Sequence, residues 1–272
     1  MRVHAAKLLT LWSLLTILGS ADAADLCPTH QLKARLSRAQ AVRVIAKEKV
    51  YTEGLLFSKG YLYESVGLPR QSELRQIDPY TGIRKTLHTV KPEYFAEGLA
   101  LANGKMIQLT YQENVALIYD SGHLEQEVSY PGESWGLTQL NGELVKSDGT
   151  DKLVFLDPAT LNQTRSITVH DNKTTYPKLN ELEAARGLIL ANIFGKDWVA
   201  MINPATGCVI GKIDLSPLRT TDTYSSKEAR CYGKKCVKDD FATNGIAYDD
   251  IKDELYFTGK NWPYIFVFKF PR

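Results

Sequence analysis

Beyond its first 24 residues, the 272-residue sequence has no apolar run approaching the roughly 18 uncharged residues that a membrane helix needs. It also has no charge excess, since 33 Lys and Arg stand against 31 Asp and Glu. Nucleic-acid-binding domains usually carry a strong basic surplus. These two absences argue against a membrane protein and against a nucleic-acid partner.

The amino-terminal segment is the exception to this lack of apolar runs. The stretch from Met1 to Lys7 is basic, residues 8–19 are mostly apolar, and Ala21 and Ala23 are the small residues that precede signal-peptidase cleavage. This pattern is typical of a secretory signal peptide, whose apolar core is too short to cross a bilayer. We therefore expect a signal peptide over 1–23, a single domain over 24–272, and export to the periplasm or beyond.

Histidine and cysteine are also scarce, with five and four copies. The cysteines lack the CxxC spacing and neighbouring histidines of a zinc site, and an even number of cysteines in an exported chain favours disulfides. Three pairings are open. We favour a local bridge between Cys231 and Cys236, which enclose a short polar loop, and a second bridge that pins Cys27 in the N-terminal tail to Cys208.

Helical periodicity is nearly absent, apart from a short stretch at 29–40 that has some helical character. Instead, strand-length apolar runs alternate with Gly, Asn, Asp and Pro turns, and a short signature recurs at intervals of roughly 40 to 65 residues. Its five copies are Tyr51–Leu55, Phe95–Leu99, Ser134–Leu137, Leu179–Leu182 and Thr243–Ile246. A period of this length predicts an all-β, five-bladed propeller with four-stranded antiparallel blades.

The ends of the chain fit a closed ring. The last blade has no outer strand of its own, because the sequence stops after the apolar run 264–270. The run 41–50, which precedes the first signature, reads as a strand, and we expect it to pair beside the C-terminal strand and remove the open edge. An insertion at about 216–241 holds the predicted local disulfide.

The first strand of each propeller blade lines the central channel. The residue before the glycine in each signature, or before its equivalent, should therefore point to the axis, and these residues are Glu53, Glu97, Trp135, Asn180 and Asn244. Two carboxylates in a narrow channel repel each other, and one of them is expected to have a raised pKa. This favours a functional pocket over a merely hydrated channel.

The motifs of this chain together resemble the plant and bacterial type of glutaminyl-peptide cyclotransferase, a family of five-bladed propellers. The resemblance spans nearly the whole domain. It is carried by Tyr51–Leu55, Leu62–Gly67, Phe95–Gly98, Gln108–Tyr111, Trp135–Leu137, Ser147–Gly149, Leu179–Glu183, Ala191–Phe194, Asn244–Asp249 and Thr258–Pro263.

The resemblance implies an enzyme that converts the N-terminal glutamine of peptides and proteins to pyroglutamate and releases ammonia, without catalytic zinc. It implies Glu97 as the proton shuttle, with Asn180 and Lys260 as further catalytic groups. The substrate contacts that it implies are Glu53, Phe95, Tyr111, Trp135, Phe194 and Trp262. In this family position 51 is often Phe, position 53 Gln, and positions 111 and 194 Trp.

From this resemblance we expect a monomer that needs no cofactor, although a structural cation could occupy the central channel. Two alternatives remain open from the sequence. One is a non-catalytic exported propeller that binds a peptide or a protein partner. The other is a metal-dependent, lactonase-like hydrolase. The Gly-x-Ser-x-Gly pattern at 132–136 opens a predicted propeller strand, so it does not indicate a serine hydrolase, which needs a strand-turn-helix context.

Overall fold

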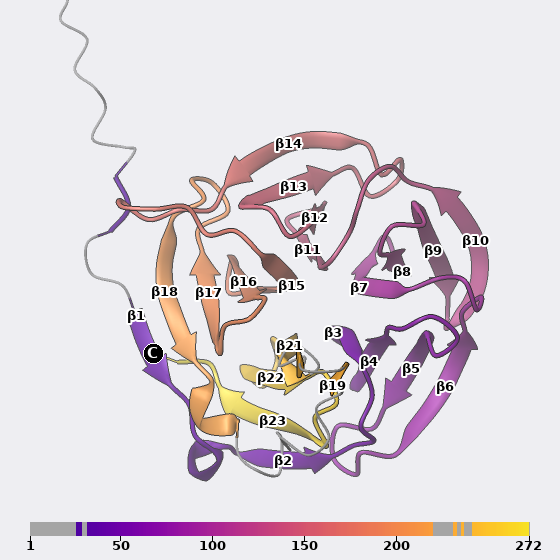
Figure 1. Ribbon diagram of the computed structural model, residues 1–272, viewed down its shortest axis with the longest axis horizontal. Coiled ribbons are helices and arrows are strands. Elements are labelled where there is room, and N and C mark those ends of the chain that lie inside the picture. The colour runs from indigo at the N-terminus through magenta and orange to yellow at the C-terminus, as the bar shows by residue number, and fades with distance from the viewer. Residues whose placement is uncertain (1–25, 29–31, 220–230, 233–234, 237–240, 272) are drawn as a thin grey trace, which may run out of the picture.

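The computed structural model describes residues 26–28, 32–219, 231–232, 235–236 and 241–271. The predicted signal peptide over 1–23 and most of the predicted insertion lie outside these residues. Five sheets stand around a central axis like the blades of a propeller (Figure 1). The predicted five-bladed, antiparallel fold is confirmed.

The blades are numbered in chain order, and the strands of each blade are given from the axis outwards. Blade 1 consists of β3 (Thr52–Ser58), β4 (Tyr61–Val66), β5 (Glu73–Ile77) and β6 (Arg84–Thr89). Blade 2 consists of β7 (Ala96–Ala102), β8 (Lys105–Thr110), β9 (Val115–Asp120) and β10 (His123–Ser129). Blade 3 consists of β11 (Leu137–Leu140), β12 (Glu143–Lys146), β13 (Lys152–Leu156) and β14 (Gln163–Thr168).

The last two blades also recruit the N-terminal segment. Blade 4 consists of β15 (Leu179–Ala185), β16 (Leu188–Ile193), β17 (Trp198–Ile202), β18 (Val209–Asp214) and β1 (Leu32–Arg35). Blade 5 consists of β21 (Thr243–Asp249), β22 (Glu254–Gly259), β23 (Tyr264–Lys269) and β2 (Arg43–Ala46). Between them lie the short helix η3 (Ser216–Leu218) and the small hairpin of β19 (Cys231–Tyr232) and β20 (Lys235–Cys236).

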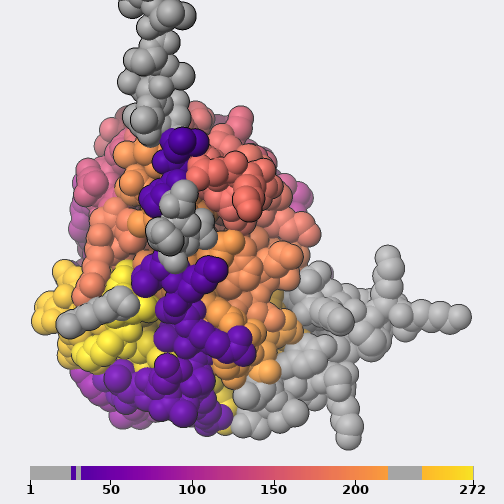
Figure 2. Space-filling view, turned by 90° about the vertical axis from the view of Figure 1, so that its left-hand side faces the viewer, coloured from indigo at the N-terminus to yellow at the C-terminus, as the bar shows by residue number. Residues whose placement is uncertain are grey.

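The ring closes as the sequence predicts. Strand β2 pairs antiparallel with β23, with Val44 opposite Phe266, so a strand from the start of the chain becomes the outer strand of the last blade and covers the edge of β23. In Figure 2 the indigo N-terminal segment runs along the outer edge of the orange and yellow blades.

The helical expectation for 29–40 is wrong. Residues 32–35 form β1, which pairs parallel with β18, and helical geometry is confined to the short helix η2 (Arg38–Gln40). The physical reason is the alternation of exposure along β1, where Leu32 and Ala34 pack against the core while their neighbours face solvent. That alternation fits the edge of a sheet, and it gives blade 4 a fifth strand.

The core consists of apolar clusters between neighbouring blades. Blades 4 and 5 share the largest, which includes Trp262, Phe266 and Phe268, and blades 5 and 1 share another around Leu55 and Tyr256. Comparable clusters join the remaining neighbours. Each fully buried large side chain contributes about 1.5–3 kcal/mol. This packing holds the innermost strands in fixed positions around the axis.

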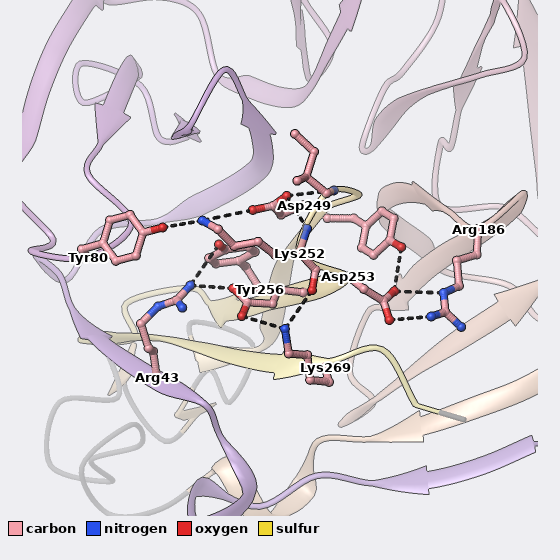
Figure 3. Close-up of polar contacts among 11 residues, drawn as sticks. Arg43, Tyr80, Arg186, Asp249, Lys252, Asp253, Tyr256 and Lys269 are labelled. Atoms are coloured by element: carbon pink, nitrogen blue, oxygen red, sulfur yellow. Dashed lines mark hydrogen bonds and ion pairs between the residues drawn. The ribbon is translucent and has the colours of Figure 1, made fainter.

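Polar contacts add to the junctions of blade 5, on the rim where the innermost strands end (Figure 3). Arg43 of β2 pairs with Glu254 at 2.8 Å, Arg186 of blade 4 pairs with Asp253, and Lys252 donates to the hydroxyl of Tyr80 in blade 1. An exposed ion pair such as that of Arg186 and Asp253 contributes at most about 1 kcal/mol. We infer that these contacts support a closure whose main energy is apolar burial.

The disulfide predicted between Cys27 and Cys208 is present, with Cα atoms 5.3 Å apart. It fixes the N-terminal tail to blade 4, where Cys27 also exchanges two hydrogen bonds with the side chain of Asn172. Cys231 and Cys236 are directly opposite each other in the β19 and β20 ladder. Their side chains lie outside the description, so their bridge stays a prediction. Among the described residues, none belongs to a helix that could cross a membrane.

Candidate active site

Residues from the signatures meet where the innermost strands begin. Glu53, Glu97, Asn180 and Asn244 are 0–6% exposed. The register of β3, β7, β15 and β21 shifts at these positions, between residues 52 and 54, 96 and 99, 179 and 182, and 243 and 246. Such bulges turn a side chain out of the normal alternation of a strand. The bulged signatures therefore aim polar groups at the axis.

The signature glycines bring neighbouring strands into contact. A Cβ at Gly98 would lie 2.4 Å from the backbone nitrogen of Leu137, and one at Gly136 would lie 2.2 Å from the carbonyl oxygen of Asn180. Both distances are far below ordinary contact, so no larger residue fits without a backbone shift. The glycines set the small diameter of the ring and thus the closeness of the polar residues beside them.

A buried ion pair lies at the centre of the site. Lys260, which follows β22, places its Nζ 2.7 Å from Oε1 of Glu53, and their side chains are 7% and 0% exposed. Asn244 donates to the other carboxylate oxygen, Oε2, at 2.8 Å. Burial disfavours the charge on Lys260, but Glu53 and other neighbours outweigh it and raise the pKa of Lys260. The lysine therefore stays protonated at neutral pH.

Glu97 lies beside this pair and is less well satisfied. Its Oε2 is buried and has no hydrogen-bond partner within the described residues. Burial, followed by the charge of Glu53, raises the pKa of Glu97 well above that of an ordinary glutamate. Burial also raises the pKa of Glu53, although Lys260 opposes this shift. The titrations of the two carboxyl groups depend on each other, and because the pKa of Glu97 is raised further, we place the proton of the pair on Glu97.

Aromatic side chains surround these groups on two sides. The ring of Phe95 packs against Tyr51 at 6.2 Å and against Tyr111 at 5.7 Å between centroids. On the other side the indole of Trp135 packs edge-on against Phe194 at 5.8 Å. All five rings are partly exposed. They can hold an uncharged carbon chain above the buried acids.

Lys260 contacts both the aromatic walls and the buried acids. Its Nζ lies 4.4 Å from the ring centre of Tyr51 and 5.6 Å from that of Phe194. Cation and ring attract each other at such distances. The structure therefore brings together the predicted residues Glu53, Glu97, Lys260 and Phe194, together with Tyr51, which the sequence analysis had not assigned to the site.

Trp262 does not join these aromatic walls. It is fully buried, its indole nitrogen donates to the carbonyl of Phe241 at 3.1 Å, and its ring packs on Phe266 inside the cluster between blades 4 and 5. The expectation that it contacts substrate stays a prediction, and the structure places it behind the exposed rings. Its physical role is to support the turn that carries Lys260, because Gly259 packs directly on the indole.

Glu133 is a site residue that sequence reasoning missed. Its Oε1 accepts the indole N–H of Trp135 at 2.7 Å, and its charge and hydrogen bond, after burial, raise the pKa of Tyr111. One carboxylate thus orients residues of both aromatic walls. Its position two residues before Trp135 was the available signal. Because the indole N–H is already engaged, Asn180 and Lys260 remain the stronger donors toward a substrate.

Glu181 bridges inner strands of other blades, and this too was not predicted. It stands in blade 4 where the other four signatures have glycine. Its two carboxylate oxygens accept the backbone N–H groups of Leu55 at 3.1 Å and Ile246 at 2.9 Å, from β3 and β21. Those bonds span the axis just beneath Glu53. The bond to Leu55 joins blades 4 and 1, which are not neighbours in the ring, so Glu181 ties together inner strands from opposite sides of the channel.

The described residues offer one cluster of metal-ligand type, formed by Cys27, His170 and Cys208. Two of its members are joined in the disulfide, and the cluster belongs to the outer edge of blade 4. The described pocket residues are acids, amides, a lysine and aromatic rings. This set suits proton transfer and polar recognition better than zinc ligation.

Comparison with known proteins agrees with this arrangement. The sequence profile of the glutamine cyclotransferase family matches residues 13–270. Glutaminyl-peptide cyclotransferase of Arabidopsis thaliana is 32% identical over 240 residues, which cover 85% of this chain and 72% of that protein.

Structural comparison gives the same result. The crystal structure of Myxococcus xanthus glutaminyl cyclase superposes with a TM-score of 0.74 and 30% identity, over 88% of this chain and 97% of that one. A chain in the crystal structure of a mitotic checkpoint complex, at 11% identity, covering 85% of this chain and 96% of that one, with a TM-score of 0.50, is similar in fold alone. The chain belongs to the glutamine cyclotransferase family.

Proposed function

We propose that the protein is a glutaminyl-peptide cyclotransferase, which converts N-terminal glutamine to pyroglutamate. The observation that carries this proposal is the buried carboxyl of Glu97, with an oxygen that lacks a partner among the described residues, beside the Glu53 and Lys260 ion pair. In a member of this family, such an acid under aromatic walls suits a reaction that moves one proton within one substrate residue.

Ring formation needs the substrate folded back on itself. The nitrogen of the α-amine forms a bond to the γ-amide carbon, and the bond from that carbon to the amide nitrogen breaks. Holding the side chain in this geometry can supply a large part of the acceleration. Phe95, Trp135 and Phe194 are the rings that would press the methylene groups together. Glu53 would bind the α-ammonium group before it is deprotonated.

The carboxyl pair can both supply and recover the proton that the reaction moves. The α-amine loses a proton as it attacks, and the amide nitrogen must gain one to leave as ammonia. Glu97, whose pKa is raised by burial and by Glu53, can hand its proton to the leaving nitrogen and recover one from the amine. The pair ends with the protons it started with, so no cofactor is required for this step.

Charge also develops on the γ-carbonyl oxygen during attack. Lys260 has N–H groups beyond the one that Glu53 accepts, and Asn180 is a buried amide at the corresponding position of the blade 4 signature. We propose these two as the donors that stabilise the oxyanion, because fixed donors in a dry site are most effective where charge appears. We also propose that catalysis needs no zinc, and export remains our expectation from the N-terminal sequence.

Mass spectrometry tests the proposal directly. Peptides that differ only in beginning with Gln or Asn are incubated with the protein, and we expect the Gln peptide alone to lose one molecule of ammonia. The Asn side chain is one methylene shorter and would need a four-membered ring. Activity should persist after treatment with a chelator. If neither peptide changes mass, the non-catalytic binding propeller is the better interpretation, and activity lost to chelation would favour a metal-dependent enzyme.

A further inference from the structure

A second cavity adjoins the active pocket on the side of Tyr51. It has a volume of about 520 Å³ and is lined by residues that include Tyr51, Leu68, Arg70, Glu73 and Phe241. The ring of Tyr51 contacts Phe95 and Lys260 of the active pocket, so this one side chain forms the wall between the two spaces. A substrate chain that leaves the pocket over Tyr51 enters this cavity.

The loop 67–72 between β4 and β5 forms one side of the cavity and is firmly held. Leu68 and Arg70 have φ angles of +81° and +67°, which non-glycine residues seldom adopt. The loop is fixed by the hydroxyl of Ser72, which donates to the carbonyl of Tyr94 at 2.9 Å and accepts from the backbone of Ala96 at 3.0 Å. Arg70 is thus presented from a rigid backbone that is tied to the start of β7.

The charged side chains that line the cavity differ in whether they have a partner of opposite charge. Glu48 and Glu73 are both engaged by the buried Arg75, at 3.0 and 2.6 Å, and Glu48 is also paired with Arg84. Arg70 is exposed, and within the described part of the chain its guanidinium has no ion pair or hydrogen bond. The carboxylates of the wall are therefore neutralised. The lining cations are Lys49, Arg70 and Arg75. We take Arg70 as the one available to a ligand, because Arg75 is engaged by Glu48 and Glu73.

We propose that this cavity is a subsite for the residues that follow the N-terminal glutamine of the substrate, and that it recognises a carboxylate among them through Arg70. This inference rests on the proposed function, since it names the class of peptide that the same site prefers. The volume lies within the range of small-ligand sites and holds a short peptide segment. The carboxylate is either an acidic side chain or the C-terminus of a short peptide.

The test compares substrates that reach the cavity with one that does not. Ammonia release is measured for glutamine amide, which occupies the inner pocket alone, and for the C-terminally amidated peptides Gln-Ala-Glu-Ala and Gln-Ala-Lys-Ala. A single partly exposed ion pair predicts about a fivefold preference of kcat/KM for the Glu peptide. Gln-Ala-Ala with a free C-terminus, compared with its amide, shows whether a terminal carboxylate is recognised as well.

The variants are Arg70→Ala and Arg70→Glu, with Lys59→Glu as a matched control. Lys59 is exposed at the β3 to β4 turn, the opposite end of blade 1. We expect Arg70→Ala to abolish the preference and Arg70→Glu to reverse it, with glutamine amide unchanged within about twofold. An equal loss on all substrates, or a wild-type protein without preference, would overturn the subsite.

Failure of the proposed function gives a different result. No substrate, glutamine amide included, would then release ammonia from the wild-type protein. In that case the affinity of fluorescently labelled Gln-Ala-Glu-Ala amide is measured by anisotropy. Weaker binding to Arg70→Glu than to wild type and Lys59→Glu supports the carboxylate subsite, and equal binding to all three proteins overturns it.

Discussion

Four buried glutamates lie along one channel. Glu53 and Glu97, the upper pair, differ in their hydrogen-bond partners from Glu181 and Glu183, the lower pair. Glu181 and Glu183 accept backbone N–H groups, from Leu55 and Ile246 and from Tyr248. Glu53 is instead held by side chains, and Glu97 has an oxygen without a partner in the described structure. Backbone donors identify acids that hold the ring together. An unsatisfied buried acid identifies the place where a substrate belongs.

The largest expected effect comes from Glu97→Gln. The amide cannot exchange a proton, so kcat for ammonia release should fall at least about 10³-fold. The melting temperature should stay close to that of the wild type, because the carboxyl contributes one poorly satisfied group to the fold. Calorimetry and an ammonia assay on the same preparation check this. Near-normal turnover by the variant would remove Glu97 from the mechanism.

Glu183→Gln should change how stability depends on pH. Burial, opposed by hydrogen bonds from Tyr248 and Thr138, raises the pKa of Glu183 to about 8. The folded state therefore holds this proton more tightly than the unfolded chain, and stability falls as pH rises from about 4.5 through about 8.

The amide at position 183 can still accept from Tyr248 and donate to Thr138, but it does not titrate. The variant should therefore gain about 3 kcal/mol relative to wild type between pH 5 and pH 8. Denaturant unfolding at the two pH values measures this difference. A parallel pH dependence for both proteins would mean that Glu183 does not titrate in that interval.

Glu181→Gln should affect the fold and leave the chemistry intact. One of its two acceptor oxygens becomes an N–H₂ group that faces a backbone N–H of Leu55 or Ile246. An unsatisfied buried donor costs about 1–3 kcal/mol, which urea unfolding can resolve. The kcat of the folded variant should match the wild type. A large loss of kcat at unchanged stability would instead place Glu181 with the upper pair.

The smallest expected effect is a shift in the pH profile of Glu53→Gln. The charge of Glu53 raises the pKa of Glu97, and Lys260 would lose its carboxylate partner. Both changes favour ionised Glu97, so the alkaline limb of kcat/KM should move about one pH unit lower. Glu183 is not among the groups that raise the pKa of Glu97, so Glu183→Gln should leave this limb in place. A limb that moves to higher pH would contradict the hypothesis that the charge of Glu53 raises the pKa of Glu97.

Much of the fold could be predicted because a propeller repeats. The five signatures located the inner strands, and the missing outer strand of the last blade required a partner, which β2 provides. The edge strand β1 was not predicted, because a strand of four residues is too short to show a clear alternation of apolar and polar residues. Its parallel partner β18 also lies far along the chain. The disulfide between Cys27 and Cys208 followed from the cysteine count and from the local loop assigned to the other two.

The candidate site could be predicted only in part. The signatures indicated Glu53, Glu97 and Asn180, and the family resemblance added Lys260. Sequence did not reveal that Glu181 bridges strands from two other blades, since its contact with Leu55 joins residues 126 positions apart. Nor did it separate Trp262, which packs in the core, from the exposed rings. Both facts depend on distant neighbours that no local pattern records.

The carboxyl of Glu181 also connects parts of the ring that are not neighbours. Its bond to Leu55 joins blade 4 to blade 1, and its bond to Ile246 joins blade 4 to blade 5. The inner strands of three blades are thereby held at one spacing, two residues along β3 from Glu53. A change at this one carboxyl would therefore be transmitted to the strands that carry Glu53 and Asn244.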